Sequence, residues 1–373
     1  MFSSKVLRAT LATLTLLPFV GAGVSLAQQS GATSTAPLVV ARQGNRPFGG
    51  RVVEDLIAGT RLSCDHGYVN FQIPLAPRRY PLLMVHASSK KTWETTFHGT
   101  EGFRDIFLRR GFSTWITDLP RTGQAGQGCG ATSYTPALSD KSRFNSWRLG
   151  LWLLERAAPD WYPGVQFPTN DAAALDEFFR VQTPEFNAPE NEQVETDALA
   201  VLLREIGPSV VLTHSSTGIR GWITGIKSDK VAAIVSYEPG AVVFPEGEVP
   251  PNIPRADGAQ VVPGRAVPMA DFLKLTRMPI QIIWGDYIPA TLDPVNVGQR
   301  LTLDSRRINL LRSKLFVEAI NRHGGDAQNL VLPDIGIRGN THFPMLDVNN
   351  VQIADLLSRF LREKGLDRRK NDL

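Results

Sequence analysis

The sequence predicts one α/β domain built on a mostly parallel sheet with helices on both faces. Short apolar runs, such as Leu82–Val85 and Val210–Leu212, are typical of strands that are buried on both faces. Helical segments separate these runs, and such alternation of strands and helices indicates a parallel sheet. A chain of 373 residues is long enough for one large domain that carries an insertion.

The N-terminal segment has the pattern of a signal peptide. Lys5 and Arg8 precede a mostly apolar stretch over 9–24, and Ser25-Leu26-Ala27 offers a cleavage pattern of small residues, so residues 1–27 are predicted to be removed after Ala27. The stretch is shorter than the ~20 residues of a membrane span, which argues against a stable membrane anchor. We therefore expect a secreted protein, periplasmic or extracellular. Residues 28–47 are predicted to be disordered because they are rich in Gln, Gly, Ser and Thr.

The domain itself is predicted over 48–373, and its elements follow in order. Strands are expected at 51–57, 68–73, 82–85, 113–117, 210–212, 231–236, 280–284 and 330–332. Helices are expected at 103–110, between the 210–212 strand and about 227, at 310–322 and at 351–364. Residues from about 124 to 195 are rich in aromatic side chains and do not follow the alternation of strands and helices. They are therefore predicted to form an inserted cap over the sheet.

Charge and cysteine content exclude several classes of protein. The formal charge is +4, and removing Lys5 and Arg8 leaves +2, which is too small to predict a nucleic-acid partner. The chain has no CxxC or HExxH motif, so neither a metal nor another cofactor is expected. Cys64 and Cys129 are its only cysteines. Whether they form a disulfide or remain free thiols stays open, because spacing does not show that they meet.

The clearest chemical signal is the turn Thr213-His214-Ser215-Ser216-Thr217-Gly218, which follows a buried strand and precedes a helix. A serine in that position fits a nucleophile elbow, although threonines occupy the flanking positions where glycine is usual. Ser216 is the rival, because Gly218 closes the five-residue window centred on it. Ser215 is preferred because it directly ends the strand and has the smaller Thr213 at the flanking position.

A serine nucleophile needs a base and an acid. His342 follows the last strand and precedes the last helix, where this arrangement places its histidine. Two carboxylates end strands, Glu238 and Asp286, and the commoner position of the acid favours Asp286. Backbone N–H groups of Ser216 and Ser88, the second in the loop after Val85, are the predicted oxyanion donors.

Several ordered segments resemble secreted bacterial esterases of the α/β-hydrolase superfamily whose serine turn reads Ser-His-Ser-Gln-Ser-Gly. They are Thr92–Thr96, Phe107–Thr114, Thr213–Ile219, Ala233–Gly240, Gly339–His342 and Asp347–Asn350. The resemblance, from about Tyr68 to Phe360, implies an α/β-hydrolase fold with a cap, and a catalytic triad of Ser215, Glu238 and His342. It also implies a small-molecule ester substrate and is compatible with a homodimer. Ser88-Ser89 stand where the family's best-known member has adjacent cysteines joined in a disulfide.

The sequence thus predicts a serine esterase that works through an acyl-enzyme. Two alternatives remain open. One is hydrolysis of another acyl bond, such as a lactone or an amide. The other is a catalytically inactive hydrolase fold that acts as a binding protein, since a fold by itself does not imply activity.

Overall fold

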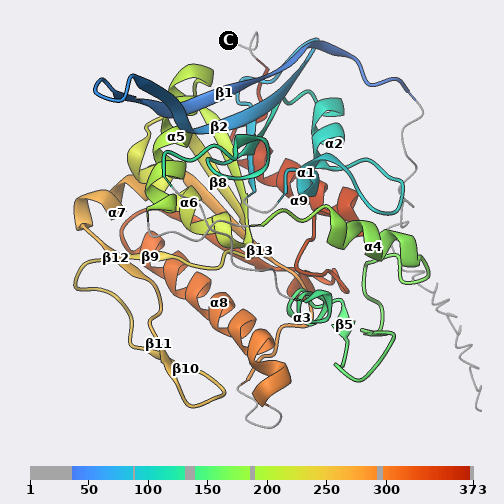
Figure 1. Cartoon of the computed structure of the whole chain (residues 1–373). Coiled ribbons are helices and arrows are strands. Elements are labelled where there is room, and N and C mark those ends of the chain that lie inside the picture. Colours follow the sequence, from blue (N-terminus) through green and yellow to red (C-terminus); the bar gives the residue numbers. More distant parts are fainter. Residues whose placement is uncertain (1–35, 87–88, 131–138, 185–189, 292–296, 370–373) are drawn as a thin grey trace, which may run out of the picture. The chain divides into compact units, whose positions relative to one another are not determined.

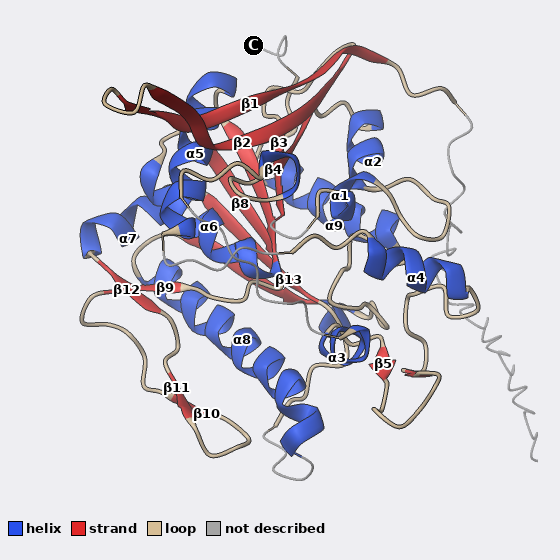
Figure 2. Ribbon diagram, viewed as in Figure 1, coloured by secondary structure: helices blue, strands red, loops and turns tan. Residues whose placement is uncertain are grey.

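The computed structural model describes residues 36–86, 89–130, 139–184, 190–291 and 297–369. These described residues belong to one compact unit. The predicted signal peptide over 1–27 lies outside the described residues. Figures 1 and 2 show a central sheet with helices against both of its faces.

The sheet has eight strands in the order β1-β2-β4-β3-β7-β8-β13-β14. Six neighbouring strands, from β4 to β14, run parallel, and β1 and β2 join them in antiparallel pairs at one edge. The mostly parallel sheet is confirmed. The strands are β1 (Val40–Asp55), β2 (Thr60–Pro74), β3 (Leu82–His86), β4 (Thr114–Asp118), β7 (Ser209–His214), β8 (Val231–Tyr237), β13 (Pro279–Trp284) and β14 (Asp326–Val331).

Alternate side chains of each central strand supply two separate cores. On β3, Leu82 and Met84 pack into one core, while Leu83 and Val85 pack into the other. The first core is covered by α1 (Lys91–Glu94), α2 (Phe103–Arg109) and α9 (Asn350–Glu363). The second is covered by α5 (Asn191–Ile206), α6 (Gly218–Lys227), α7 (Met269–Leu275) and α8 (Val297–Arg322). Burial on both faces explains why these strands read as apolar runs.

The predicted cap region supplies its own elements. It contains α3 (Asp140–Ser146), the short strands β5 (Gly150–Leu151) and β6 (Asp160–Trp161), and α4 (Ala172–Arg180). The aromatic side chains of this region largely pack together: Phe178 contacts Phe167, Trp147 and Phe343 at ring-centroid distances of 5.2–5.5 Å. The helix α5 begins at Asn191, before the expected end of the insertion, and belongs to the covering of the sheet.

Residues 249–268 contain three short strands. These are β10 (Ile253–Pro254), β11 (Gln260–Val261) and β12 (Arg265–Val267), of which β12 pairs with β9 (Val243–Pro245). Three short 3₁₀ turns complete the described elements, at Gly123–Ala125, Ser215–Thr217 and Leu332–Ile335.

The prediction of disorder over 28–47 is wrong for residues 40–47, which belong to β1. Strand β1 pairs with β2 along nearly its whole length, and most of its side chains are exposed. Backbone pairing holds this hairpin, so its sequence lacks the apolar alternation by which strands are recognised. Gly49 and Gly50, both with positive φ, interrupt the pattern further.

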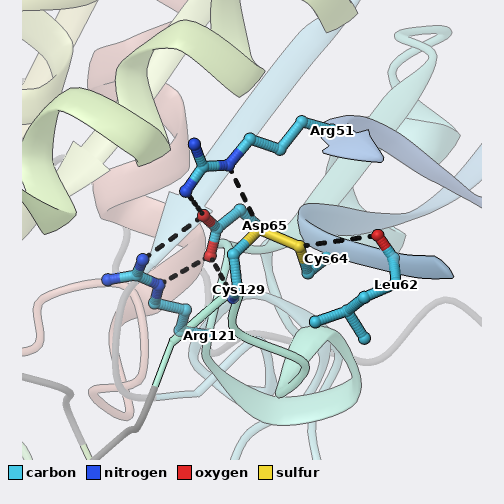
Figure 3. The surroundings of a disulfide bond; sticks show 6 residues. All are labelled: Arg51, Leu62, Cys64, Asp65, Arg121 and Cys129. Atoms are coloured by element: carbon cyan, nitrogen blue, oxygen red, sulfur yellow. Dashed lines mark hydrogen bonds and ion pairs between the residues drawn. A yellow bond between two sulfur atoms is a disulfide. The ribbon is translucent and has the colours of Figure 1, made fainter. Parts of the chain in front are cut away.

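A disulfide joins Cys64 on β2 to Cys129 in the loop after β4, which settles the pairing that the sequence left open. Figure 3 shows Asp65 beside this bond, between the guanidinium groups of Arg51 and Arg121. The Arg121–Asp65 ion pair is 2.8 Å long and buried. Although burial acts to raise the pKa of Asp65, the hydrogen bonds from Arg121 and the Cys129 amide together with both arginine charges lower it overall.

Candidate active site

Ser215 lies on a sharp turn between β7 and α6. Its φ is +54°, a left-handed conformation that few non-glycine residues adopt. Strain of this kind persists where the surroundings enforce it and is concentrated at functional sites. Here the backbone N–H of Gly240 donates to the carbonyl of Ser215 at 2.9 Å, which ties the turn to the loop after β8.

The two threonines that replace glycines in the elbow pattern have specific places. The hydroxyl of Thr213 donates to that of Ser236 on β8 at 2.8 Å, and the Thr213 methyl group faces Gly221, where a Cβ would lie 2.9 Å from it. The Thr217 hydroxyl accepts from the backbone N–H of His214 at 3.0 Å. The space that glycine usually provides inside the turn is thus supplied by Gly221 on α6.

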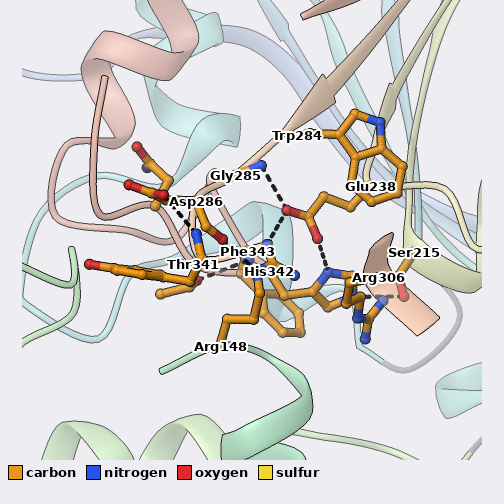
Figure 4. A network of polar contacts seen from close by, with 12 residues as sticks. Arg148, Ser215, Glu238, Trp284, Gly285, Asp286, Arg306, Thr341, His342 and Phe343 are labelled. Atoms are coloured by element: carbon orange, nitrogen blue, oxygen red, sulfur yellow. Dashed lines mark hydrogen bonds and ion pairs between the residues drawn. The ribbon is translucent and has the colours of Figure 1, made fainter. Parts of the chain in front are cut away.

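Ser215, His342 and Glu238 form one hydrogen-bonded chain, drawn in Figure 4. The Ser215 hydroxyl lies 2.9 Å from Nε2 of His342, and Nδ1 of His342 lies 2.5 Å from Oε2 of Glu238. His342 and Glu238 are buried. The loops that follow β7, β8 and β14 thus bring together the three residues that the sequence analysis singled out.

Asp286, the alternative acid, has other partners. Its carboxylate accepts from the backbone N–H groups of Tyr287 at 2.7 Å and Gly339 at 2.9 Å, so it holds its own loop and the loop that precedes His342. Position along the sheet favoured Asp286, but the side chain that reaches His342 is Glu238.

Glu238 is held from three directions. Besides His342, it accepts from the backbone N–H of Gly285 at 2.8 Å and from the guanidinium of Arg148. A Cβ on Gly285 would lie 2.5 Å from the Thr341 carbonyl, so only glycine permits this approach. Glu238 and Arg148 both have positive φ, +48° and +61°. Arg148 comes from the cap region, just after α3, and is fully buried.

The cap region also holds the loop of His342. The backbone N–H of His342 donates to the carbonyl of Trp147 at 2.9 Å, and that of Gln166 donates to Gly339 at 2.8 Å. Arg148 Nε donates to the Asp286 carbonyl at 2.6 Å. The segment Trp147-Arg148 therefore fixes the backbone of His342 and the carboxylate of Glu238 at once.

Two further histidines continue the network behind His342. The backbone N–H of Ser89 donates to Nδ1 of His86 at 3.0 Å, Nε2 of His86 lies 2.9 Å from Nδ1 of His214, and Nε2 of His214 lies 2.7 Å from the His342 carbonyl. A backbone amide only donates, so His86 carries its proton on Nε2 and, in turn, so does His214. The N–H groups of this series of hydrogen bonds all point the same way, from the loop after β3 toward the loop of His342.

All three histidines are held neutral. Burial lowers the pKa of His86 to about 3. Burial, with the charges of His342 and His86, lowers the pKa of His214 well below its ordinary value. For His342, burial lowers the pKa most, and the positive charges of Arg306 and Arg148 add to it. A neutral His342 is in the form that accepts a proton.

Of the two predicted oxyanion residues, Ser88 lies outside the described residues. Ser216 follows Ser215 in the 3₁₀ turn Ser215–Thr217, where its carbonyl accepts from Arg220 at 2.9 Å. His86 and Ser89, on either side of the undescribed pair 87–88, are buried.

Sequence reasoning missed Arg148, Arg306 and the pair His86–His214. Neither arginine stands in a recognisable motif, and both reach the site from elements whose packing the sequence did not reveal. For the histidines a signal existed, since His86 and His214 each end a buried strand, and β3 and β7 are neighbours in the sheet.

Within the described ranges, no group of three or more His, Cys, Asp or Glu side chains is placed to hold a metal ion. Nor does any helix of the described part of the chain combine the length and apolar character needed to cross a membrane.

No protein-family model matches the chain, but it is similar to known proteins, among them a probable lipase and an esterase. A probable secreted lipase, phiG, of a fungus (Fungal sp., strain ATCC 74256) is 25% identical over 328 residues, which cover 80% of this chain and 86% of that protein. A solved structure described as a novel bacterial esterase is 27% identical, with a TM-score of 0.68, covering 89% of this chain and 99% of the other. These similarities and the sheet topology show that the protein has the α/β-hydrolase fold.

Proposed function

We propose that the protein is a secreted serine hydrolase of carboxylic esters, with Ser215 as nucleophile, His342 as base and Glu238 as the acid that orients it. The hydrogen-bonded chain from the Ser215 hydroxyl through His342 to Glu238 carries this proposal. The similarity to a probable secreted lipase and to a bacterial esterase supports ester bonds as the substrate class.

In the proposed reaction, Ser215 Oγ attacks the acyl carbon while Nε2 of His342 takes its proton. Glu238 stabilises the imidazolium that forms, and backbone N–H groups after Ser215 and in the loop after β3 stabilise the oxyanion. His342 then protonates the leaving alkoxide, so an acyl group remains on Ser215 and the alcohol departs. Water, deprotonated by His342, releases the acid and restores the serine.

The test is hydrolysis of p-nitrophenyl acetate, butyrate and octanoate by the mature protein and by Ser215→Ala. We expect activity that falls at least about 10³-fold in the variant, because the nucleophile and its acyl-enzyme are lost. A fluorophosphonate should label Ser215 covalently and leave the variant unlabelled. Folded protein that neither turns over an ester nor reacts with the fluorophosphonate would instead favour the inactive binding protein.

Secretion is a separate part of the proposal. It depends on the signal-peptide pattern, and the name of the lipase relative agrees with it. N-terminal sequencing of exported protein should find Gln28 as the first residue, and retention of Lys5 would contradict cleavage. The homodimer stays a prediction, to be checked by sedimentation.

A further inference from the structure

Arg306 on α8 is a charged residue for which the proposed ester hydrolysis has no use so far. Figure 4 shows its guanidinium directed toward the end of the network where Ser215 and His342 meet. After burial, its positive charge is the strongest influence that lowers the pKa of His342. Arg306 therefore acts electrostatically on the reaction centre.

The hydrogen-bond partners of Arg306 are neutral. Its Nε donates to the carbonyl of Ser146 and its Nη2 donates to the Ser146 hydroxyl, both at 3.2 Å. No carboxylate of the described residues lies within ion-pair distance of it. Since Ser146 occupies the edge formed by Nε and Nη2, the end formed by the two terminal nitrogens retains N–H groups for another acceptor.

The charges around Arg306 leave it uncompensated. The groups that act on it are Arg148, with a positive charge, and Glu238, with a negative one. These two pair with each other, and Glu238 also accepts from Gly285 and His342. Their charges cancel, so the charge of Arg306 has no counterpart among the described residues of the site.

The side chain of Arg306 is partly buried, and a cation that is partly withdrawn from water without an acidic partner is destabilised. Burial, followed by the charge of Arg148, lowers the pKa of Arg306 to about 10. The next residue on the same helix shows the usual solution, since Arg307 pairs with Asp304 at 2.6 Å. Ionisable groups with perturbed pKa values cluster at functional sites, so this cation beside the reaction centre is a candidate for binding an anionic group of a ligand.

We propose that Arg306 binds a carboxylate group of the substrate, so that the enzyme prefers esters carrying a free carboxylate in their acyl or alcohol part. Arginine is suited to this because its planar guanidinium presents paired N–H groups to a carboxylate. The inference depends on the proposed ester hydrolysis and narrows its substrate class. Ser146, in the cap region, holds the guanidinium in place.

Two pairs of esters test the preference. Mono-4-nitrophenyl succinate is compared with its methyl ester, and 4-acetoxybenzoate with methyl 4-acetoxybenzoate. The first pair carries the carboxylate in the acyl part and the second in the alcohol part. A charge-assisted hydrogen bond predicts a preference for the anionic member of at least one pair by about tenfold or more in kcat/KM.

Arg306→Gln should abolish that preference, mainly through KM for the anionic ester. The readout is the ratio of kcat/KM within each pair, because an effect of the lost charge on His342 acts on both members alike. Arg306→Lys should retain part of the preference. Arg322→Gln is the matched control: it removes the same charge from the same helix at an exposed position that pairs with Glu248. If Arg306→Gln slows both members of a pair equally, Arg306 serves the reaction or the cap and not a carboxylate, and the inference is wrong.

A binding measurement separates this inference from the proposed function. On Ser215→Ala, which cannot form an acyl-enzyme, calorimetry should detect binding of the preferred anionic ester, and adding Arg306→Gln should weaken it about tenfold. Equal affinity with and without Arg306 overturns the carboxylate site. Failure of ester hydrolysis itself would show as wild-type protein without activity on any ester and without fluorophosphonate labelling.

Discussion

At the scale of single residues, position along the sequence alone would assign the catalytic acid to the wrong carboxylate. Asp286 stands where the acid of this fold is commonest, yet its carboxylate accepts two backbone N–H groups, and Glu238 reaches His342 instead. The elbow serine was identifiable because its neighbours are small and a buried strand precedes it. Arg148 and Arg306 were not identifiable, because their roles arise only from packing between the cap region, α8 and the loops of the sheet.

The two carboxylates are distinguished by removing one charge from each. Glu238→Gln should lower kcat on the order of 10⁴-fold, since an amide no longer fixes the His342 tautomer or stabilises its cation. Asp286→Asn should cost less than about tenfold, because the amide oxygen still accepts one of the two backbone N–H groups. Steady-state kinetics on p-nitrophenyl butyrate decides, and the reverse ranking would assign the acid to Asp286.

At the scale of elements, the pattern of apolar residues predicted the central strands well. The strands β3, β7, β8 and β13 are buried on both faces and read as apolar runs. The strands expected at 51–57 and 68–73 cover only parts of β1 and β2, and the first half of α8 was missed, because exposed pairing and polar surface leave no such pattern. The short helices α3 and α4, of seven and nine residues, were not predicted either, because the aromatic-rich segment that contains them was interpreted as a single insertion.

The juxtaposition of β3 and β7 gives a prediction about their terminal histidines. At pH 7, ¹⁵N spectra should show His86 and His214 neutral and protonated on Nε2, and they should remain neutral at pH 5 because burial lowers both pKa values. A proton on Nδ1 of either ring, or an imidazolium at pH 5, would contradict the chain of hydrogen bonds.

Removing one hydrogen bond of the His86–His214–His342 series should make the position of the His342 ring less fixed. His214→Phe removes the donor to the His342 carbonyl and leaves buried groups unpaired, at a cost of about 1–3 kcal/mol each. We expect kcat to fall about tenfold or more with KM little changed. His214→Gln offers an amide donor and should recover part of the lost kcat. Equal losses of kcat in the two variants would show that the packing of the imidazole ring matters and its hydrogen bond does not.

At the scale of the whole molecule, the buried neutral histidines set the response to acid. In the unfolded chain each titrates near 6.5, while folding lowers the pKa of His86, His214 and His342. Below pH 6.5 the unfolded state therefore binds more protons, and stability falls as pH falls by about 1.4 kcal/mol per pH unit for each histidine. Burial raises the pKa of Asp347 to about 7, which acts in the opposite sense and offsets one histidine.

The melting temperature should accordingly fall from pH 7 through pH 6 to pH 5, as measured by calorimetry. His86→Gln should lessen the slope of stability against pH by about 1.4 kcal/mol per unit, whatever it does to stability at pH 7. A melting temperature that holds constant or rises on acidification would show that these histidines take up protons in the folded state.

The disulfide gives a second prediction at this scale. The bond spans 65 residues, for which the chain-entropy estimate is a stabilisation of about 4 kcal/mol. Cys64→Ser with Cys129→Ser should lower the free energy of unfolding by up to that amount in urea titrations. The reduced wild-type protein is the control and should match the double variant.

The Cys64–Cys129 bond also decides how the protein must be manufactured. Cytosolic thiol buffers keep cysteines reduced, so a chain overproduced there would lack the bond and carry two free thiols beside Asp65 and Arg121. Preparations from such a host would be heterogeneous and prone to mixed disulfides during purification. Expression with export, or in a host with an oxidising cytosol, gives the form described here.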